Sequence, residues 1–224
     1  IVGEPFYIQG EINRLVKRAN SLGMPVAIHA IGDRGVKMAL NAFEYSGNTS
    51  LANRIEHIEI IEPGDIERFK KLKVTASMQP NHGTGVIGKY ITPRVGLERE
   101  KFAYVWNDFL KSEVRLALSS DFATSPFSPL VQIADAVFRE SPTGLYDGSW
   151  YPEQALSFEQ ALYAYTQVGA DLAGWGEKIG SISVGKYADF VILDQTLSNP
   201  VGRELKSIKV AKTYFAGQLV YSQN

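Results

Sequence analysis

The stretch Val26–Gly35, VAIHAIGDRG, places a histidine inside a short apolar strand. Gly23 and Pro25 stand just before or at its start, as expected where a helix ends and a buried strand begins. Side chains alternate along a strand, so His29 shares a face with Ala27, and both faces are otherwise apolar. Such a strand is typical of a parallel sheet covered on both sides. In such folds the functional residues lie at the C-terminal ends of the strands, where this histidine is predicted to be. The alternative is a core histidine that a backbone group satisfies.

A second strand is predicted over Arg54–Ile60, RIEHIEI, and it also carries a histidine near its C-terminal end. Alternation places Ile55 and His57 on one face of this strand. We expect Ile55 to build the inward face of the sheet together with Ala27 and, from a later strand, Ala117. The next helix should begin with a proline, because the chain turns there into a new helical pattern.

Two more predicted strands end beside side chains that can bind a metal or transfer protons. A third is predicted over Val74–Gln79 and is followed by a Gly-rich loop with His82; a fourth, Val114–Ser119, leads to Asp121. Every histidine of the chain thus lies at or just past the C-terminal end of a predicted strand. The alternatives are an exposed loop residue for His82 and a cap of the following turn for Asp121.

Helices are predicted between and after these strands. Glu11–Leu22 has apolar residues at helical spacing along one side, which indicates a surface helix with one buried stripe. Asp33 is expected to be an N-cap and not a catalytic group, since capping is common between a strand and a helix. Other helix starts are indicated by Pro63, by Ser128 with Pro129, and by a capping box of Ser157 and Gln160.

Composition excludes several classes of function. The chain has 224 residues, 45% of them hydrophobic, with 23 basic and 24 acidic side chains and a formal net charge of -1. This balance argues against nucleic acid as the main ligand. We find no membrane-spanning run and no signal-peptide pattern, and the expected location is cytoplasmic. Without cysteine there is no disulfide, thiolate nucleophile or cysteine-ligated zinc, so any metal needs His, Asp, Glu or Lys.

The C-terminal segment differs in character from the rest. Helical periodicity stops near Gly180, and short runs follow that are typical of strands: Ser181–Val184, Phe190–Leu193, Ile208–Phe215 and Gln218–Tyr221. The sequence therefore predicts two units, a strand-and-helix unit over residues 1–179 and a small β-module over residues 180–224.

The strand-end residues together suggest a metal site. Strand-then-helix units with short connections imply a parallel sheet with right-handed crossovers. Residues at the C-terminal strand ends of such a sheet converge, which would make His29, His57, His82 and Asp121 neighbours. Imidazoles and a carboxylate on rigid strands suit a divalent metal such as zinc, and a carboxylate beside metal-activated water suits a general base.

The motifs resemble those of a known family. VAIHAIGDRG, RIEHIEI, SMQPNH and LALSSD, followed by YPEQALSFEQALYAYT and IGSISVGKYADFVILD, look like the C-terminal half of an amidohydrolase-superfamily enzyme. They are most similar to the amidohydrolase family 3 branch of metal-dependent hydrolases, and the segments match in order over nearly the whole chain. The resemblance implies part of a (β/α)8 TIM-type barrel, strands five to eight with their helices, plus C-terminal strands of a small β-sandwich.

The resemblance also implies roles for single residues. His29 resembles the fifth-strand metal ligand, His57 the sixth-strand ligand, and Asp121 the eighth-strand aspartate that binds metal and moves protons. His82 resembles a substrate-binding histidine of the seventh strand. Family members carry an H-x-H pair on the first strand, and this chain has none. Because the chain also starts at Ile1, we expect that processing or truncation has removed an upstream part.

The predicted function is hydrolysis of amide or related C–N bonds in a small-molecule substrate, with one or two divalent metals, expected to be zinc. A rival is a metal-free, non-catalytic fragment or regulatory half-barrel. A third possibility, a sugar-phosphate isomerase barrel, is disfavoured because no Gly-rich phosphate cradle follows the last strand. Open strand edges predict a homo-oligomer or pairing with the missing N-terminal half.

Overall fold

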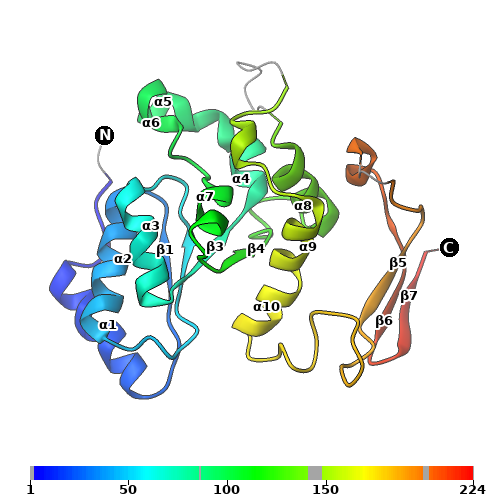
Figure 1. The fold of residues 1–224 in the computed structure, drawn as a ribbon, viewed down its shortest axis with the longest axis horizontal. Helices are drawn as coiled ribbons and strands as arrows, with labels where there is room; N and C mark the ends of the chain where they lie inside the picture. Colours follow the sequence, from blue (N-terminus) through cyan, green and yellow to red (C-terminus); the bar gives the residue numbers. More distant parts are fainter. Residues whose placement is uncertain (1–2, 86, 141–147, 199–201, 224) are drawn as a thin grey trace.

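The chain forms a mixed α/β fold with two separate sheets (Figure 1). A computed structural model describes residues 3–85, 87–140, 148–198 and 202–223. The larger sheet has four strands in the order β1-β2-β3-β4, and the smaller has three in the order β5-β6-β7. The strands of the larger sheet are β1 (Ala27–Ala30), β2 (Arg54–His57), β3 (Thr75–Met78) and β4 (Leu116–Leu118).

Helices alternate with the strands of the larger sheet and continue beyond it. In Figure 1, α2 lies along β1, whereas α9 and α10 lie beside β4. The α-helices are α1 (Gln9–Ser21), α2 (Asp33–Ser46), α3 (Pro63–Leu72), α4 (Pro80–Thr84), α5 (Ile91–Val95), α6 (Leu97–Glu100), α7 (Trp106–Lys111), α8 (Pro129–Phe138), α9 (Phe158–Tyr165) and α10 (Gln167–Leu172). The 3-10 helices are η1 (Gly88–Tyr90), η2 (Pro152–Gln154) and η3 (Arg203–Lys206).

The prediction of four neighbouring parallel strands is confirmed. β1 pairs with β2, β2 with β3 and β3 with β4, each in parallel. The strands are shorter than predicted: β2 ends early, at His57, and β3 and β4 are shortened at both ends. Among the described residues β1 pairs only with β2 and β4 only with β3, so both are edges of an open sheet.

The register corrects the expected composition of the inward face. Ile55 pairs with Ile28, not with Ala27, and is fully buried on the face that the helices cover. Ala27 shares the other face with Arg54, because directly paired residues of parallel strands point to the same side. Ala117 belongs to that second face, as predicted. Ile55 was misassigned because alternation also places Ile58 and Ile60 on the opposite face of this run, so the sequence did not show which face the helices cover.

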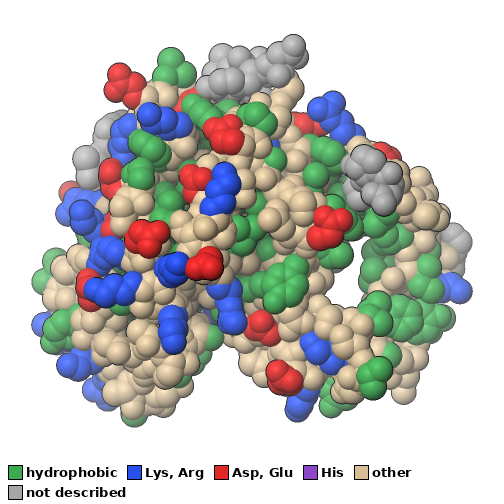
Figure 2. Space-filling view, in the orientation of Figure 1, with side chains coloured by type: hydrophobic (Ala, Val, Ile, Leu, Met, Phe, Trp, Pro, Cys, Tyr) green, Lys and Arg blue, Asp and Glu red, His purple; other side chains and the backbone are tan. Residues whose placement is uncertain are grey.

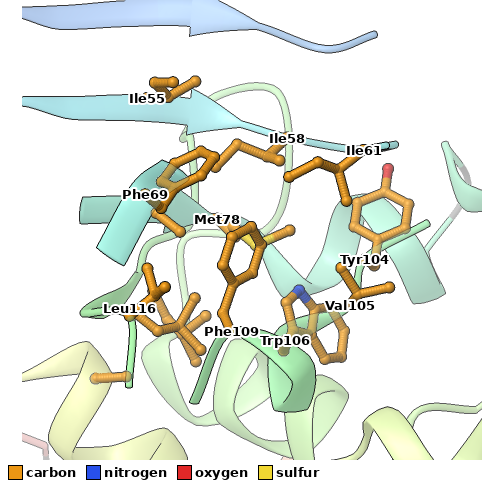
Figure 3. Packing of buried hydrophobic residues seen from close by; sticks show 14 of the residues in the cluster. Ile55, Ile58, Ile61, Phe69, Met78, Tyr104, Val105, Trp106, Phe109 and Leu116 are labelled. Atoms are coloured by element: carbon orange, nitrogen blue, oxygen red, sulfur yellow. The ribbon is translucent and has the colours of Figure 1, made fainter. Parts of the chain in front are cut away.

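The covered face of the sheet builds the main hydrophobic core. Figure 3 shows Ile55, Met78 and Leu116 packed against aromatic side chains of the helices. The rings of Phe69 (α3) and Phe109 (α7) meet edge to face, with centroids 5.1 Å apart. Each buried side chain of this size contributes about 1.5–3 kcal/mol, so this layer fixes where the strand ends lie.

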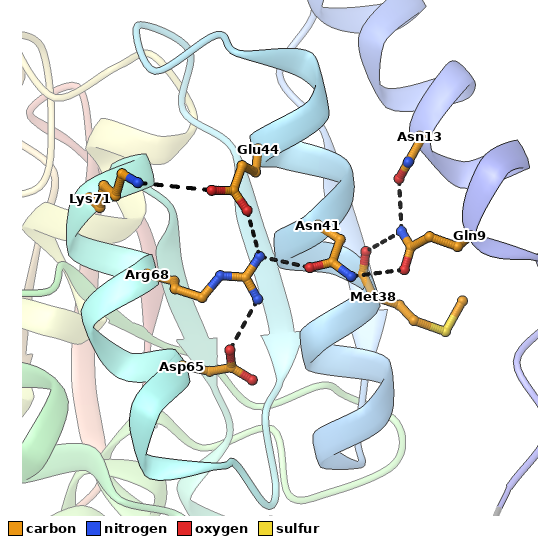
Figure 4. A network of polar contacts seen from close by, with 8 residues as sticks. All are labelled: Gln9, Asn13, Met38, Asn41, Glu44, Asp65, Arg68 and Lys71. Atoms are coloured by element: carbon orange, nitrogen blue, oxygen red, sulfur yellow. Dashed lines mark hydrogen bonds and ion pairs between the residues drawn. The ribbon is translucent and has the colours of Figure 1, made fainter.

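A polar network ties the three N-terminal helices together (Figure 4). Arg68 of α3 donates to Asn41 and Glu44 of α2 at 2.7 and 2.9 Å, and to Asp65 of its own helix at 3.0 Å. Asn41 in turn donates to Gln9 of α1 at 3.1 Å. This network holds α1, α2 and α3 as one layer on the sheet.

The helix starts predicted from proline and from the capping box are confirmed, whereas α1 begins at Gln9, two residues before the predicted Glu11. Pro63 and Pro129 are first helical residues, and Ser157 with Gln160 forms the capping box. The N-cap prediction for Asp33 is wrong, because Gly32 occupies that position and Asp33 is the first helical residue. Its carboxylate accepts from the backbone N–H of the next residue and pairs with a downstream arginine.

The C-terminal sheet is antiparallel and consists of β5 (Phe190–Leu193), β6 (Val210–Phe215) and β7 (Gln218–Ser222). The strand expected at Ser181–Val184 is absent, because this segment forms no ladder with any described strand. Its apolar side chains Ile182 and Val184 are 88% and 106% exposed, so no buried apolar surface stabilises a strand there.

The surface carries charges of both signs, which are interspersed on the face in Figure 2. This mixture agrees with the formal net charge of -1. In the part of the chain that the structure describes, no helix has the length and apolar character needed to cross a bilayer.

Candidate metal centre

The three histidines meet at the C-terminal ends of the parallel strands. His29 lies on the open face of β1 and is exposed, while His57 is the last residue of β2 and is partly buried. Their ring centroids are 4.5 Å apart, with the planes at 68°. The two side chains from adjacent strands therefore lie in direct contact.

An unusual backbone brings His57 to this position. His57 has φ +77° and the next residue, Ile58, has φ +51°. Simple alternation would place His57 with Ile55 on the covered face, but the left-handed conformation turns its side chain toward His29. For a β-branched residue such as Ile58 this conformation costs on the order of 1–3 kcal/mol, and such strain concentrates at functional sites.

His82 is the most buried of the three histidines, at 3% exposure, and lies on α4. Its ring stacks on that of His57, with centroids 5.7 Å apart and planes at 6°. Its Nδ1 is 3.5 Å from Oε1 of Glu59, and its Nε2 is 3.6 Å from Oδ2 of Asp121. His82 therefore lies between two carboxylates.

Asp121 follows β4, with φ +54° and a side chain that is 40% exposed. One ligand atom each from His57, His82 and Asp121 can be chosen so that all lie within 4.8 Å of one another. His29 is outside this group of three but adjoins it through His57. The structure thus brings all four predicted site residues together, with His57 and Asp121 at the centre.

The unpartnered nitrogens of this cluster fit a divalent cation. Nδ1 of His57 and both ring nitrogens of His82 are buried and have no hydrogen-bond partner among the described residues. A buried polar atom left unpaired costs about 1–3 kcal/mol, and an imidazole nitrogen is a common metal ligand. Ligands about 2.1 Å from a tetrahedral zinc lie roughly 3.4 Å apart, close to the spacing of His82 and Asp121.

The electrostatics of His57 favour the form that can bind a metal. Burial, followed by the nearby His29, lowers the pKa of His57 below its ordinary value, whereas Asp121 and Glu59 oppose the shift. A neutral imidazole retains the lone pair that a metal requires. The direction of this pKa shift thus favours the neutral imidazole that a metal ligand needs.

Sequence reasoning missed two residues of the site. Glu59 is 7% exposed and faces His82, and Tyr104 is fully buried with its ring against Gly83. Burial, and next the charge of Glu59, raise the pKa of Tyr104 well above its ordinary value. The acid two residues after His57 was a usable signal for Glu59. Nothing in the sequence pointed to Tyr104, which reaches the site from a loop between α6 and α7.

Comparison with known proteins places the chain in a family. Residues 2–221 match the model of the amidohydrolase family. The chain is 34% identical to the protein LONG AFTER FAR-RED 3 of Arabidopsis thaliana over 94% of its own length and 36% of that protein. It is 30% identical to the N-substituted formamide deformylase of Arthrobacter pascens, over 99% of the chain and 41% of that enzyme.

A solved structure is similar as well. An uncharacterized metal-dependent hydrolase from Pyrococcus horikoshii OT3 superposes with a TM-score of 0.73 and 35% identity, over 84% of this chain and 37% of that one. The chain thus spans well under half the length of these relatives.

Proposed function

The chain belongs to the amidohydrolase family, as its motifs predict, and on this premise we propose that it forms part of a metal-dependent hydrolase that cleaves amide or related C–N bonds. The observation that carries the proposal is the cluster of His57, His82 and Asp121, whose donor atoms lie within 4.8 Å. A metal-free regulatory half-barrel is less favoured, because it would leave buried imidazole nitrogens unpaired at a cost in stability.

We assign His29, His57 and Asp121 as metal ligands and His82 as a substrate-binding residue. The donor set of imidazoles with one carboxylate suits zinc. When bound, such an ion supplies Lewis acidity that activates a water and polarises the scissile carbonyl. His57 and Asp121 belong both to this proposed ligand set and to the group of His57, His82 and Asp121 whose donor atoms lie within 4.8 Å of one another.

Asp121 is assigned the proton transfers. Its carboxylate is partly exposed, so Oδ2 can accept a proton from the attacking water and later release it to the leaving nitrogen. His82 is held on its other side by Glu59 and faces this oxygen from 3.6 Å. It can thereby fix the carboxylate and contact a substrate oxygen.

The name of one relative supports the choice of a substrate class to assay. The Arthrobacter protein is named as a deformylase of N-substituted formamides. We propose N-substituted formamides as the first compounds to assay, with simple amides and cyclic ureas as comparison classes.

The larger sheet is proposed to be strands five to eight of a (β/α)8 barrel within residues 1–179, and residues 180–224 to be part of a β-sandwich. Its open face supports this, since exposed His29 and the partly exposed ion pair of Arg54 and Glu56 lie where further strands would close a barrel. The fit to 37% of the Pyrococcus hydrolase agrees with a partial barrel.

Open edges imply a partner for this chain. β1 and β4 are edges among the described residues, and Leu219, Val220 and Tyr221 of β7 are each about half exposed. Such edges pair readily. We propose association with a second copy or with a complementary N-terminal half. Light scattering of the purified chain should show a dimer, or an aggregate that the complementary half resolves; a stable monomer would contradict the proposal.

The substitution Asp121→Asn tests the proposed reaction. In the zinc-loaded active assembly, kcat should fall about 100- to 10,000-fold because the proton acceptor is lost, while KM changes much less. Steady-state kinetics with an N-substituted formamide measure both. Glu113→Gln, which changes an exposed acid of the pair with Lys70 near the strand starts, is the matched control. Unchanged turnover of the Asp121 variant would show that Asp121 caps the turn and takes no part in catalysis.

A further inference from the structure

Helix α8 buries two polar side chains beside the candidate site. Gln132 is 0% exposed and Asp135 is 2% exposed, although neither lies in the centre of the apolar stripe of this helix. A fully buried amide or carboxylate is tolerated only where its hydrogen-bonding groups are satisfied. Their partners therefore show what these side chains do.

Gln132 uses its whole side-chain amide to join two separate segments. Its Oε1 accepts from the backbone N–H of Asn81 at 3.1 Å. Its Nε2 donates to Oγ of Ser125 at 3.1 Å and to the carbonyl of Pro126 at 3.0 Å. An amide offers one acceptor oxygen and two donor protons, so both ends are engaged.

Both of these segments carry a site residue. Asn81 immediately precedes His82 on α4. Ser125 donates from its hydroxyl to the carbonyl of Ser120, the residue just before Asp121. One buried side chain thus links the backbone next to His82 with the loop that holds Asp121.

Asp135 strengthens the same link from one turn further along α8. Its Oδ2 accepts from Nδ2 of Asn81 at 2.7 Å, and its Oδ1 lies 2.9 Å from Nζ of Lys206. Asn81 is therefore held through both its backbone and its side chain. The α4 segment, only five residues long, obtains its position largely from α8.

We propose that Gln132 is a positioning residue that sets the separation between His82 and Asp121. The inference rests on the proposed metal-dependent function. Asp121 is an assigned metal ligand, and its Oδ2 lies 3.6 Å from Nε2 of His82, which helps to orient the carboxylate. Bonds between a metal and its ligands tolerate deviations of only about 0.2 Å in length, so this orientation affects binding. Releasing either segment from Gln132 would let this spacing widen, which weakens metal binding and misdirects the Asp121 carboxylate.

The test compares two changes at Gln132 with a matched buried glutamine. Gln132→Met keeps the side-chain length and removes every hydrogen bond, whereas Gln132→Glu keeps the acceptor for Asn81 and removes the donors. Gln154→Met is the control, because Gln154 is 5% exposed and accepts from the backbone N–H of Asp108 away from the site. Zinc affinity by calorimetric titration, the visible spectrum of the cobalt-substituted chain and the thermal midpoint are measured for each.

Both Gln132 variants should bind zinc about 10- to 100-fold more weakly than the wild type, with an altered cobalt spectrum, as found for groups that orient metal ligands. Gln154→Met should lose comparable thermal stability but keep its zinc affinity within about twofold. If Gln132→Met fails to fold, Ser125→Ala removes one of the same bonds and should still weaken zinc binding.

Two results would overturn the inference. Gln132 variants that bind zinc as tightly as the Gln154 control would refute the positioning role and leave the proposed function intact. A wild-type chain that binds no zinc would refute the proposed function and this inference together.

Discussion

Replacing His57 by Ala is expected to lower the zinc affinity of the chain by more than about 100-fold. His57 contacts both other histidines, and it belongs both to the assigned ligand set and to the cluster with His82 and Asp121. Even partners that only orient metal ligands cost about 10- to 100-fold when removed, so loss of a ligand should cost more. Calorimetric titration with zinc measures the effect, and thermal unfolding without metal checks that the variant still folds.

Two companion variants separate the possible ligand sets. The assignment of His29 as a ligand predicts that His29→Ala weakens zinc binding more than His82→Ala. The reverse order would favour a centre built from His57, His82 and Asp121, with Glu59 orienting His82. Zinc affinity that survives His57→Ala would contradict both sets.

Replacing Arg139 by Met is expected to lower the free energy of unfolding by about 3–5 kcal/mol. Arg139 is fully buried, with its guanidinium 4.4 and 4.9 Å from the ring centroids of Trp106 and Trp150. It donates to the carbonyls of Trp150 at 2.7 Å and Tyr104 at 2.8 Å. Methionine fills similar space but leaves these buried acceptors without donors.

Urea unfolding followed by tryptophan fluorescence measures this loss, since two tryptophans flank the side chain. Arg139→Lys should also be destabilised, because a single ammonium cannot serve both carbonyls in the planar geometry of a guanidinium. Arg115→Met is the matched control, as Arg115 is half exposed and makes only a 3.9 Å ion pair. A loss below about 1 kcal/mol for Arg139→Met would show that water or other groups satisfy the carbonyls.

The strand order was predictable because each strand has an apolar run followed by a helical stripe. Those patterns predict His29, His57, His82 and Asp121 at the C-terminal edge of the sheet. These patterns do not indicate which face of the sheet the helices cover. Ile55 is buried on the helix-covered face, but the run RIEHIEI has isoleucines at positions of both faces and so does not indicate which face is covered.

Other details depend on backbone conformations and distant contacts. The left-handed φ of His57 and Ile58 is not encoded by any glycine, so alternation misplaced the histidine. Gln132 sits in an ordinary amphipathic helix, and its partners are 51 residues away on one side and only six or seven on the other. Sequence separation of that kind carries no local signal, which is why the link between the two site segments emerges only from the fold.

Zinc K-edge X-ray absorption on the zinc-loaded chain tests whether the histidine cluster holds a divalent metal. We expect a shell of nitrogen and oxygen ligands at about 2.0–2.2 Å with the outer scattering of at least two imidazole rings. That imidazole signal should fall in the His57→Ala variant. A spectrum of zinc surrounded by oxygen alone, unchanged by the substitution, would show that the histidines do not bind the metal.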